Sequence, residues 1–117
     1  MDLDVNEIFV FGSNMHGMHG GGAARLASHR FGAEWGVGEG LTGRCYALPT
    51  MEGKVSLGHA VEHFTACAHD NSSLIFLVTA VGCGIAGYTP AEVAPLFKDA
   101  ALLENVYLPQ SFWEYIS

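Results

Sequence analysis

Two glycine-rich segments carry the residue types best suited to binding an anion. The first follows the apolar run Ile8–Phe11, and its candidate ligand-binding residues are Gly12, Ser13, Asn14, His19, Gly20, Gly21 and Gly22. The second follows the apolar run Leu74–Val78, and its candidates are Gly82, Cys83, Gly84, Ile85, Ala86, Gly87 and Tyr88. Glycines let the backbone approach a ligand closely, and free N–H groups at a helix start attract anions. Two such segments beyond the strands of one sheet predict a phosphate site between them.

Neither segment matches the common nucleotide-binding motifs. The chain contains no Gly-Lys-Ser/Thr sequence, and neither segment fits GxGxxG with an acidic residue about 20 positions further on. These absences disfavour a P-loop NTPase and a standard Rossmann dehydrogenase.

Several residues near these segments carry reactive groups. His16 and His19 could donate a hydrogen bond to phosphate or transfer a proton. Cys83 precedes a predicted helix, where a thiol pKa can fall, and Glu39 is a candidate general acid. Each also has a plainer interpretation, as a solvated loop residue or a small packing residue, and we predict no catalytic residue.

A possible metal motif lies further along the chain. The sequence His59-Ala60-Val61-Glu62-His63 fits the H-x-x-E-H pattern of inverted zinc proteases. However, these polar side chains fall on the polar face of a predicted helix, and no downstream ligand helix is evident. We therefore expect no metal and no cofactor.

Three aromatic residues near the end of the chain, Phe112, Trp113 and Tyr115, follow the last predicted strand. They could stack on an adenine base or close the core. We favour the core for Trp113 and leave Phe112 open.

The elements that must position these residues alternate between strand and helix. Strands are predicted at Ile8–Phe11, Cys45–Leu48, Leu74–Val78 and Asn105–Leu108. Helices are predicted at Ala23–Phe31, from an N-cap at Ser56 to about Asp70, and from Pro90 to Ala100 behind a Thr89 cap. This order predicts one α/β domain over residues 1–117, with a mainly parallel sheet of about four strands in a three-layer α/β/α arrangement.

Composition sets further limits. The chain has 117 residues, half of them apolar, which suits a single core. Its Met1–Asp4 start lacks the basic residues of a secretory signal, and no apolar run approaches the roughly 20 residues of a membrane span, so we expect a cytoplasmic protein with no membrane partner. Cys45, Cys67 and Cys83 form no CxxC pair and are expected to be reduced.

The charge balance bears on the partner. Five Lys and Arg against twelve Asp and Glu give a net charge of -7, which repels extended nucleic acid. A small phosphate ligand remains compatible, because backbone amides need no side-chain charge. The oligomeric state stays open.

Five segments resemble the macro domains, a family that binds ADP-ribose and its derivatives. Phe11–Asn14 and Gly20–Ala24 are similar to the first loop and Gly-Gly-Gly helix start of that family. Gly38–Gly40 and Tyr46–Pro49 are similar to its Gly-Glu and Tyr-x-Leu-Pro stretches. Gly82–Pro90 resembles its second phosphate loop, and this is the most specific match. The chain also looks like short macro-like proteins of phages and bacteria.

The resemblance implies a role for each segment. Asn14 would lie near the distal ribose of an ADP-ribose-like ligand, Gly20–Gly22 would lie beside its diphosphate, and Gly82–Tyr88 would wrap the other side. Hydrolytic macro domains often have an Asp where this chain has Ala23 and Ala24. Many members have an aromatic residue where this chain has Ala86, which leaves more room.

These departures favour a protein that binds an ADP-ribose-type nucleotide without consuming it. In a phage-infected bacterial cell, such a protein would capture an ADP-ribose-derived immune signal. The alternative is an ADP-ribosyl hydrolase that acts on a protein adduct or a nucleotide derivative.

Overall fold

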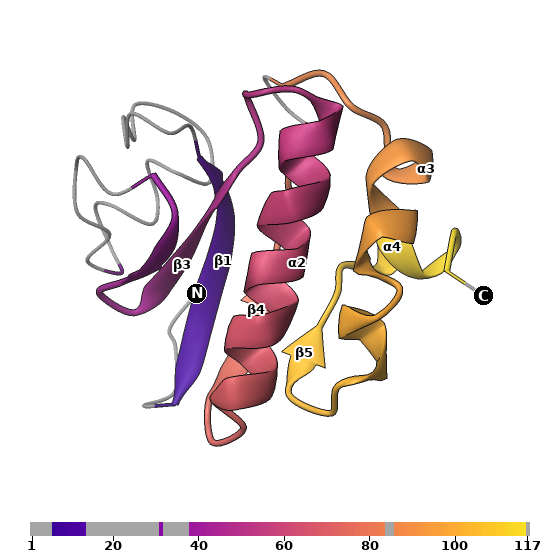
Figure 1. Cartoon of the computed structure of the whole chain (residues 1–117). Helices are drawn as coiled ribbons and strands as arrows, with labels where there is room; N and C mark the ends of the chain where they lie inside the picture. Colours follow the sequence, from indigo (N-terminus) through magenta and orange to yellow (C-terminus); the bar gives the residue numbers. More distant parts are fainter. Residues whose placement is uncertain (1–5, 14–30, 32–37, 84–85, 117) are drawn as a thin grey trace.

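The computed structural model describes residues 6–13, 31, 38–83 and 86–116. Its strands are β1 (Glu7–Ser13), β2 (Gly40–Thr42), β3 (Cys45–Pro49), β4 (Ile75–Val78) and β5 (Val106–Tyr107). Its helices are α2 (Lys54–Asp70), α3 (Pro90–Val93) and α4 (Gln110–Trp113), with 3₁₀ turns η1 (Ala94–Phe97) and η2 (Ala100–Leu102). The predicted α/β class is confirmed (Figure 1).

The five strands form one mixed sheet in the order β2-β3-β1-β4-β5. β1 pairs in parallel with both β3 and β4, and β5 pairs in parallel with β4. β2 runs antiparallel to β3 through a turn in which Gly43 has a φ of 56°. The prediction of a mainly parallel sheet of about four strands was therefore wrong. β2 has only three residues and no apolar run, and a glycine with positive φ permits the reversal.

Helix α2 lies across one face of the sheet (Figure 1), and an aromatic core fills the space between them. The ring of Phe64 on α2 lies 5.2 Å from Tyr46 and 5.5 Å from Phe76, both in edge-on geometry. It also lies 6.0 Å from Phe97 of η1, whose ring is 5.6 Å from Phe112 of α4. Phe64 thus joins the sheet to the C-terminal segment, and such aromatic pairs add to the stability gained from burial alone.

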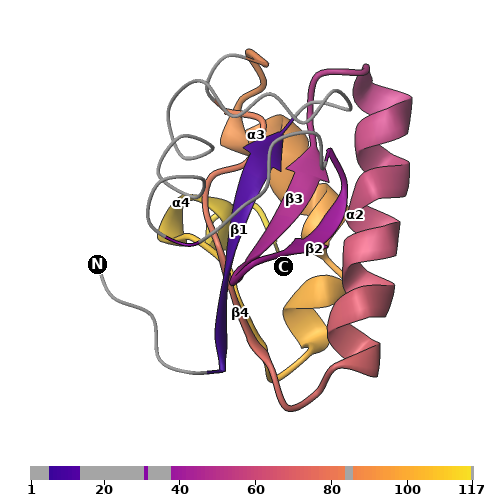
Figure 2. The same cartoon turned by 90° about the vertical axis from the view of Figure 1, so that its left-hand side faces the viewer.

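The opposite face of the central strands is also buried. Phe9 and Phe11 of β1 and Cys45 and Ala47 of β3 are at most 2% exposed. The ring of Phe31 packs 5.0 Å from Phe9, and Figure 2 shows α2 on one side of β1 and β3. Burial on both faces explains the continuous apolar run in β1. The helix predicted at Ala23–Phe31 lies, apart from Phe31, outside the described residues.

Helix α2 begins two residues before the predicted N-cap at Ser56. The N-cap is Gly53, with a φ of 96° and no side-chain cap, because the chain enters the helix through a left-handed glycine. The predicted end is correct: α2 ends at Asp70. Beyond it, Asn105 Nδ2 donates to the carbonyls of Ala68 at 2.9 Å, Leu74 at 3.0 Å and Asn71 at 3.2 Å. One side chain therefore ties the end of α2 to the strand that follows.

The segment after Thr89 starts as predicted but does not continue as one helix. Thr89 and Glu92 form a reciprocal capping box with Pro90 in the first turn. The helix stops at Val93, and 3₁₀ turns follow, because Pro95 has no N–H to donate and its ring obstructs the preceding turn. The predicted helix to Ala100 was thus wrong. Of its predicted buried residues, Val93, Phe97 and Ala100 are fully buried and Leu96 is half-buried.

The last helix turns one aromatic residue inward and leaves its neighbours outside. Phe112 is fully buried, whereas Trp113 is 45% exposed and Tyr115 is 49% exposed. The prediction of a core position for Trp113 was wrong, because a four-residue helix buries only one face. In the part of the chain that the structure describes, no helix combines the length and apolar character needed to cross a membrane.

Candidate functional site

The carboxyl ends of the three central strands meet at one point. A Cβ placed on Gly12, near the end of β1, would lie 3.4 Å from Thr50 Oγ1 and Cγ2. It would also lie 3.6 Å from the backbone nitrogen of Gly82, which follows β4. Gly12 and Gly82 are the first residues of the two glycine-rich segments, so the structure brings the origins of both segments together.

Two threonines hold β1 at this edge. Thr50 donates to the Ser13 carbonyl twice, from its backbone nitrogen at 2.9 Å and from Oγ1 at 3.3 Å. Thr79 likewise donates two hydrogen bonds to the Val10 carbonyl, from its backbone nitrogen at 3.1 Å and from Oγ1 at 2.8 Å. Neither threonine was among the residues predicted from the sequence. The sequence does carry a signal for them, because a threonine directly follows each of the two strands that flank β1.

The side chain of Ser13 faces into the protein. Ser13 is only 5% exposed, and its Oγ donates to the carbonyl of Gly38. Its hydroxyl therefore fixes the chain just before β2, and its role in ligand binding stays a prediction.

The second glycine-rich segment is closed at its base. The Tyr88 N–H donates to the Gly82 carbonyl at 2.9 Å, and Gly82 and Gly87 have φ values of 79° and 81°. A Cβ on Gly82 would lie 3.3 Å from Tyr88 Cδ2 and 3.4 Å from Val93 Cγ2. Gly82 is thus required for both its backbone conformation and its lack of a side chain. Ala86 and Tyr88 are half-buried, and Gly87 is exposed.

The capping box anchors the far end of this segment. Thr89 N donates to Glu92 Oε1 at 3.0 Å, and Glu92 N donates to Thr89 Oγ1 at 3.3 Å. The backbone hydrogen bond from Thr89, followed by the one from its hydroxyl, lowers the pKa of the Glu92 carboxyl. Glu92 is therefore held in its charged form, and its interaction with Lys54 lowers the pKa further.

The surroundings of Cys83 disfavour its thiolate form. Burial raises the pKa of its thiol, and the charge of Glu92 raises it further. Its Sγ donates to the Val81 carbonyl at 3.7 Å. Of the two interpretations left open by the sequence, the raised pKa favours a small packing residue over a nucleophile. All three cysteines are thiols, as expected.

Glu39 and the histidines of the H-x-x-E-H motif lie on or against α2. Glu39 Oε2 lies 2.9 Å from His63 Nδ1 on α2, so the candidate general acid is paired with a helix side chain. His59 Nδ1 lies 3.8 Å from Glu62 Oε2, and both side chains are exposed, as predicted for the polar face. Within the described ranges, no three metal-ligating side chains come together.

Part of the predicted site falls on residues that the structure does not describe. These are Asn14, His16, His19, Gly20, Gly21, Gly22, Gly84 and Ile85, together with Ala23 and Ala24. Their predicted roles stay predictions.

In comparisons with known proteins, the chain has no significant match to a protein-family model, a curated protein or a solved structure.

Proposed function

We propose that this chain binds an ADP-ribose-type nucleotide at the carboxyl edge of its sheet, with the diphosphate held by backbone amides of the two glycine-rich segments. The observation that carries the proposal is the meeting of Gly12, Thr50 and Gly82, which gives both segments a common origin. Ligands of open α/β sheets bind beyond the carboxyl ends of the strands.

The electrostatics favour a small ligand bound through the backbone. The chain carries a net charge of -7, and only five residues are Lys or Arg. A long polyanion would meet repulsion over its whole length, whereas one diphosphate can be held by N–H groups that carry no net charge. The crowding around Gly82 leaves no room for a side chain at the base of the second segment.

The resemblance to macro domains supplies the nucleotide class. We propose that the domain has the three-layer arrangement of that family. Burial of β1 and β3 on both faces supports this arrangement. On this proposal, Ala86 leaves room at the distal ribose for a substituent on the ligand.

The reactive groups favour binding over hydrolysis. The raised pKa of Cys83 keeps its thiol neutral, and Glu39 is paired with His63. Ala23 and Ala24 cannot transfer a proton. A protein of this kind would lower the free concentration of its ligand by stoichiometric capture, and in a phage-infected bacterial cell that ligand would be a nucleotide immune signal.

Isothermal titration calorimetry with ADP-ribose tests the site. Gly84→Glu places a side chain and a negative charge in the second segment and should abolish binding. Ser72→Glu is the matched control, because it adds the same charge at an exposed turn before β4, at the opposite end of that strand. Unchanged affinity in a folded Gly84→Glu variant would remove the second segment from the site.

The fate of the ligand separates the binder from the hydrolase. Excess protein is incubated with ADP-ribose derivatives and heat-denatured, and the supernatant is analysed by mass spectrometry. Recovery of intact ligand supports capture. Turnover at substoichiometric protein, lost in His19→Ala or Glu39→Ala, would contradict capture and establish the hydrolase.

A further inference from the structure

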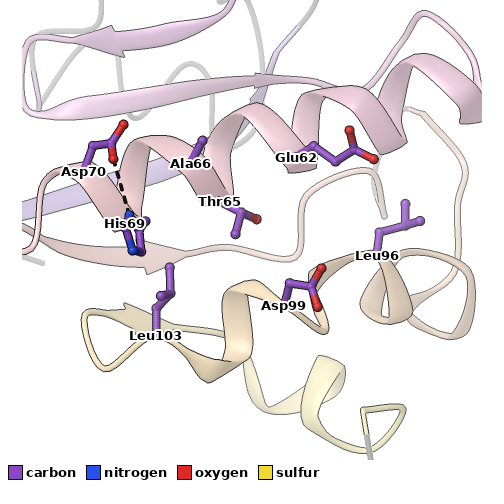
Figure 3. A pocket seen from close by; sticks show the side chains of 8 residues that line it. All are labelled: Glu62, Thr65, Ala66, His69, Asp70, Leu96, Asp99 and Leu103. Carbon is purple, nitrogen blue, oxygen red and sulfur yellow. Dashed lines mark hydrogen bonds and ion pairs between the residues drawn. The ribbon is translucent and has the colours of Figure 1, made fainter.

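A groove of about 430 Å³ lies between α2 and the segment that carries η1 and η2. Its apolar lining comes from Leu96 and Leu103 on one side and Ala66 on the other (Figure 3). The volume falls within the range of small-molecule sites. None of these residues belongs to the glycine-rich segments, so the groove is separate from the proposed nucleotide site.

Carboxylates stand at both ends of this apolar lining. Glu62 and Asp70 come from α2, and Asp99 faces them from the turn between η1 and η2 (Figure 3). Eight positions separate Glu62 from Asp70, which places their backbones about 12 Å apart along the helix axis. His69 Nδ1 lies 3.3 Å from Asp70 Oδ1 at one end. No lysine or arginine is among the described residues that line the groove.

This arrangement excludes most classes of ligand. An anion would meet three carboxylates and one imidazole, and an uncharged apolar molecule would make no use of the three carboxylates. A single metal ion cannot bridge carboxylates spaced a full two turns of helix apart, and the described residues bring no three metal ligands together. The complement of an apolar lining with separated negative charges is an aliphatic chain that carries separated positive charges.

We propose that the groove binds an aliphatic oligoamine, with its methylene chain on Leu96, Leu103 and Ala66 and its ammonium groups at the carboxylates. One exposed charge pair contributes little, so a monoamine would bind poorly. Several ammonium groups on one chain act together, because once the first is bound the others are held near their carboxylates.

Calorimetry and ¹⁵N-labelled spectra test this with putrescine, spermidine and spermine at fixed ionic strength. Affinity should rise along this series, and amide shifts should concentrate at residues 62–70 and 96–103. Asp99→Asn should weaken spermine binding about two- to fivefold, the range of one exposed charge pair. Glu114→Gln removes the same charge from an exposed position outside the groove and should leave the affinity unchanged.

A second pair of variants probes the apolar lining. Ala66→Lys puts an ammonium group inside the groove at an exposed helix position and should abolish spermine binding. Ser72→Lys adds the same charge at an exposed turn and should retain most of it. Circular dichroism is used to check that each variant folds.

Two results would overturn the proposal. Equal losses in Asp99→Asn and Glu114→Gln would mean diffuse attraction of cations to an acidic protein. Groove shifts with a lysine-rich peptide, together with none for spermine, would assign the surface to a protein partner instead.

Discussion

Glycine is expected to have opposite effects on the stability of the fold in the second glycine-rich segment and in α2. Gly82 has a φ of 79°, and its Cβ position is crowded by Tyr88 and Val93. Gly87 has a similar φ of 81° but open space around its Cβ position. Gly58 of α2 has neither constraint, since nothing lies within 4 Å of its Cβ position and its φ is not positive.

The difference separates two roles that look alike in a sequence. At the edge of the sheet, glycine allows a backbone shape that other residues adopt only with strain. Within α2, glycine increases the conformational entropy of the unfolded chain, and no feature of the helix requires it there. Substitutions along this series test the comparison directly.

The largest effect is expected for Gly82→Ala. Left-handed backbone costs a residue with a side chain about 1–2 kcal/mol, and the 3.3 Å contact with Tyr88 Cδ2 adds to this cost. We expect a lower free energy of unfolding in urea and a loss of ADP-ribose affinity. Gly87→Ala is the control, because it carries the backbone strain without the crowding. Equal destabilisation of the two variants would show that packing at Gly82 is unimportant.

Thr50→Val should have a smaller effect. It keeps the shape of the side chain but removes the 3.3 Å hydrogen bond from Oγ1 to the Ser13 carbonyl. That carbonyl still accepts the Thr50 N–H at 2.9 Å, so the loss should stay near the lower end of about 0.5–1.5 kcal/mol. Urea unfolding measures it. A loss well beyond this range would mean that the hydroxyl has a further role at the edge.

Gly58→Ala should change stability in the opposite direction. The new methyl group meets open space, and alanine is favoured over glycine within a helix by about 0.5–1 kcal/mol. We expect a higher midpoint of thermal unfolding with unchanged ligand binding. Destabilisation by this substitution would mean that the surface of α2 at Gly58 is more constrained than its surroundings indicate.

The smallest effect concerns Glu92 and depends on pH. Its pKa is lowered in the folded state, so its carboxylate stabilises the fold above the unfolded pKa, and this contribution is lost as pH falls through the folded value. Glu92→Gln should therefore unfold at a lower temperature than the wild type at pH 7, and the difference should vanish in acid. Glu104→Gln, at an exposed position, controls for the change in net charge. A difference that persisted in acid would contradict the role of the carboxylate charge.

Long apolar patterns made much of the fold predictable. The apolar runs at β1, β3 and β4 identified the central strands, and the 3.6-residue period identified α2, because burial imposes these patterns. The capping box at Thr89 was also evident, since its residue types stand at fixed spacing. Pro95 was visible in the sequence as well, but the apolar period that continues to Ala100 concealed the break.

The edge strand and the site framework were harder to foresee. β2 has only three residues, which is too short for a periodic pattern to reveal it. The pairing of Glu39 with His63 joins residues 24 positions apart, and neither residue type indicates the other. Thr50 and Thr79 act through carbonyls of β1, a relation that exists only once the strand order is known.

The strand order also bears on how the chain is made. β1 is the first described strand to leave the ribosome, yet it lies at the centre of the sheet, between β3 and β4. One edge of β1 can pair once β3 is complete at Pro49, but the other edge stays unpaired until β4 is complete at Val78. An unpaired apolar strand is the kind of segment that pairs with other nascent chains. During synthesis, the unpaired edge of β1 is therefore an expected binding site for chaperones.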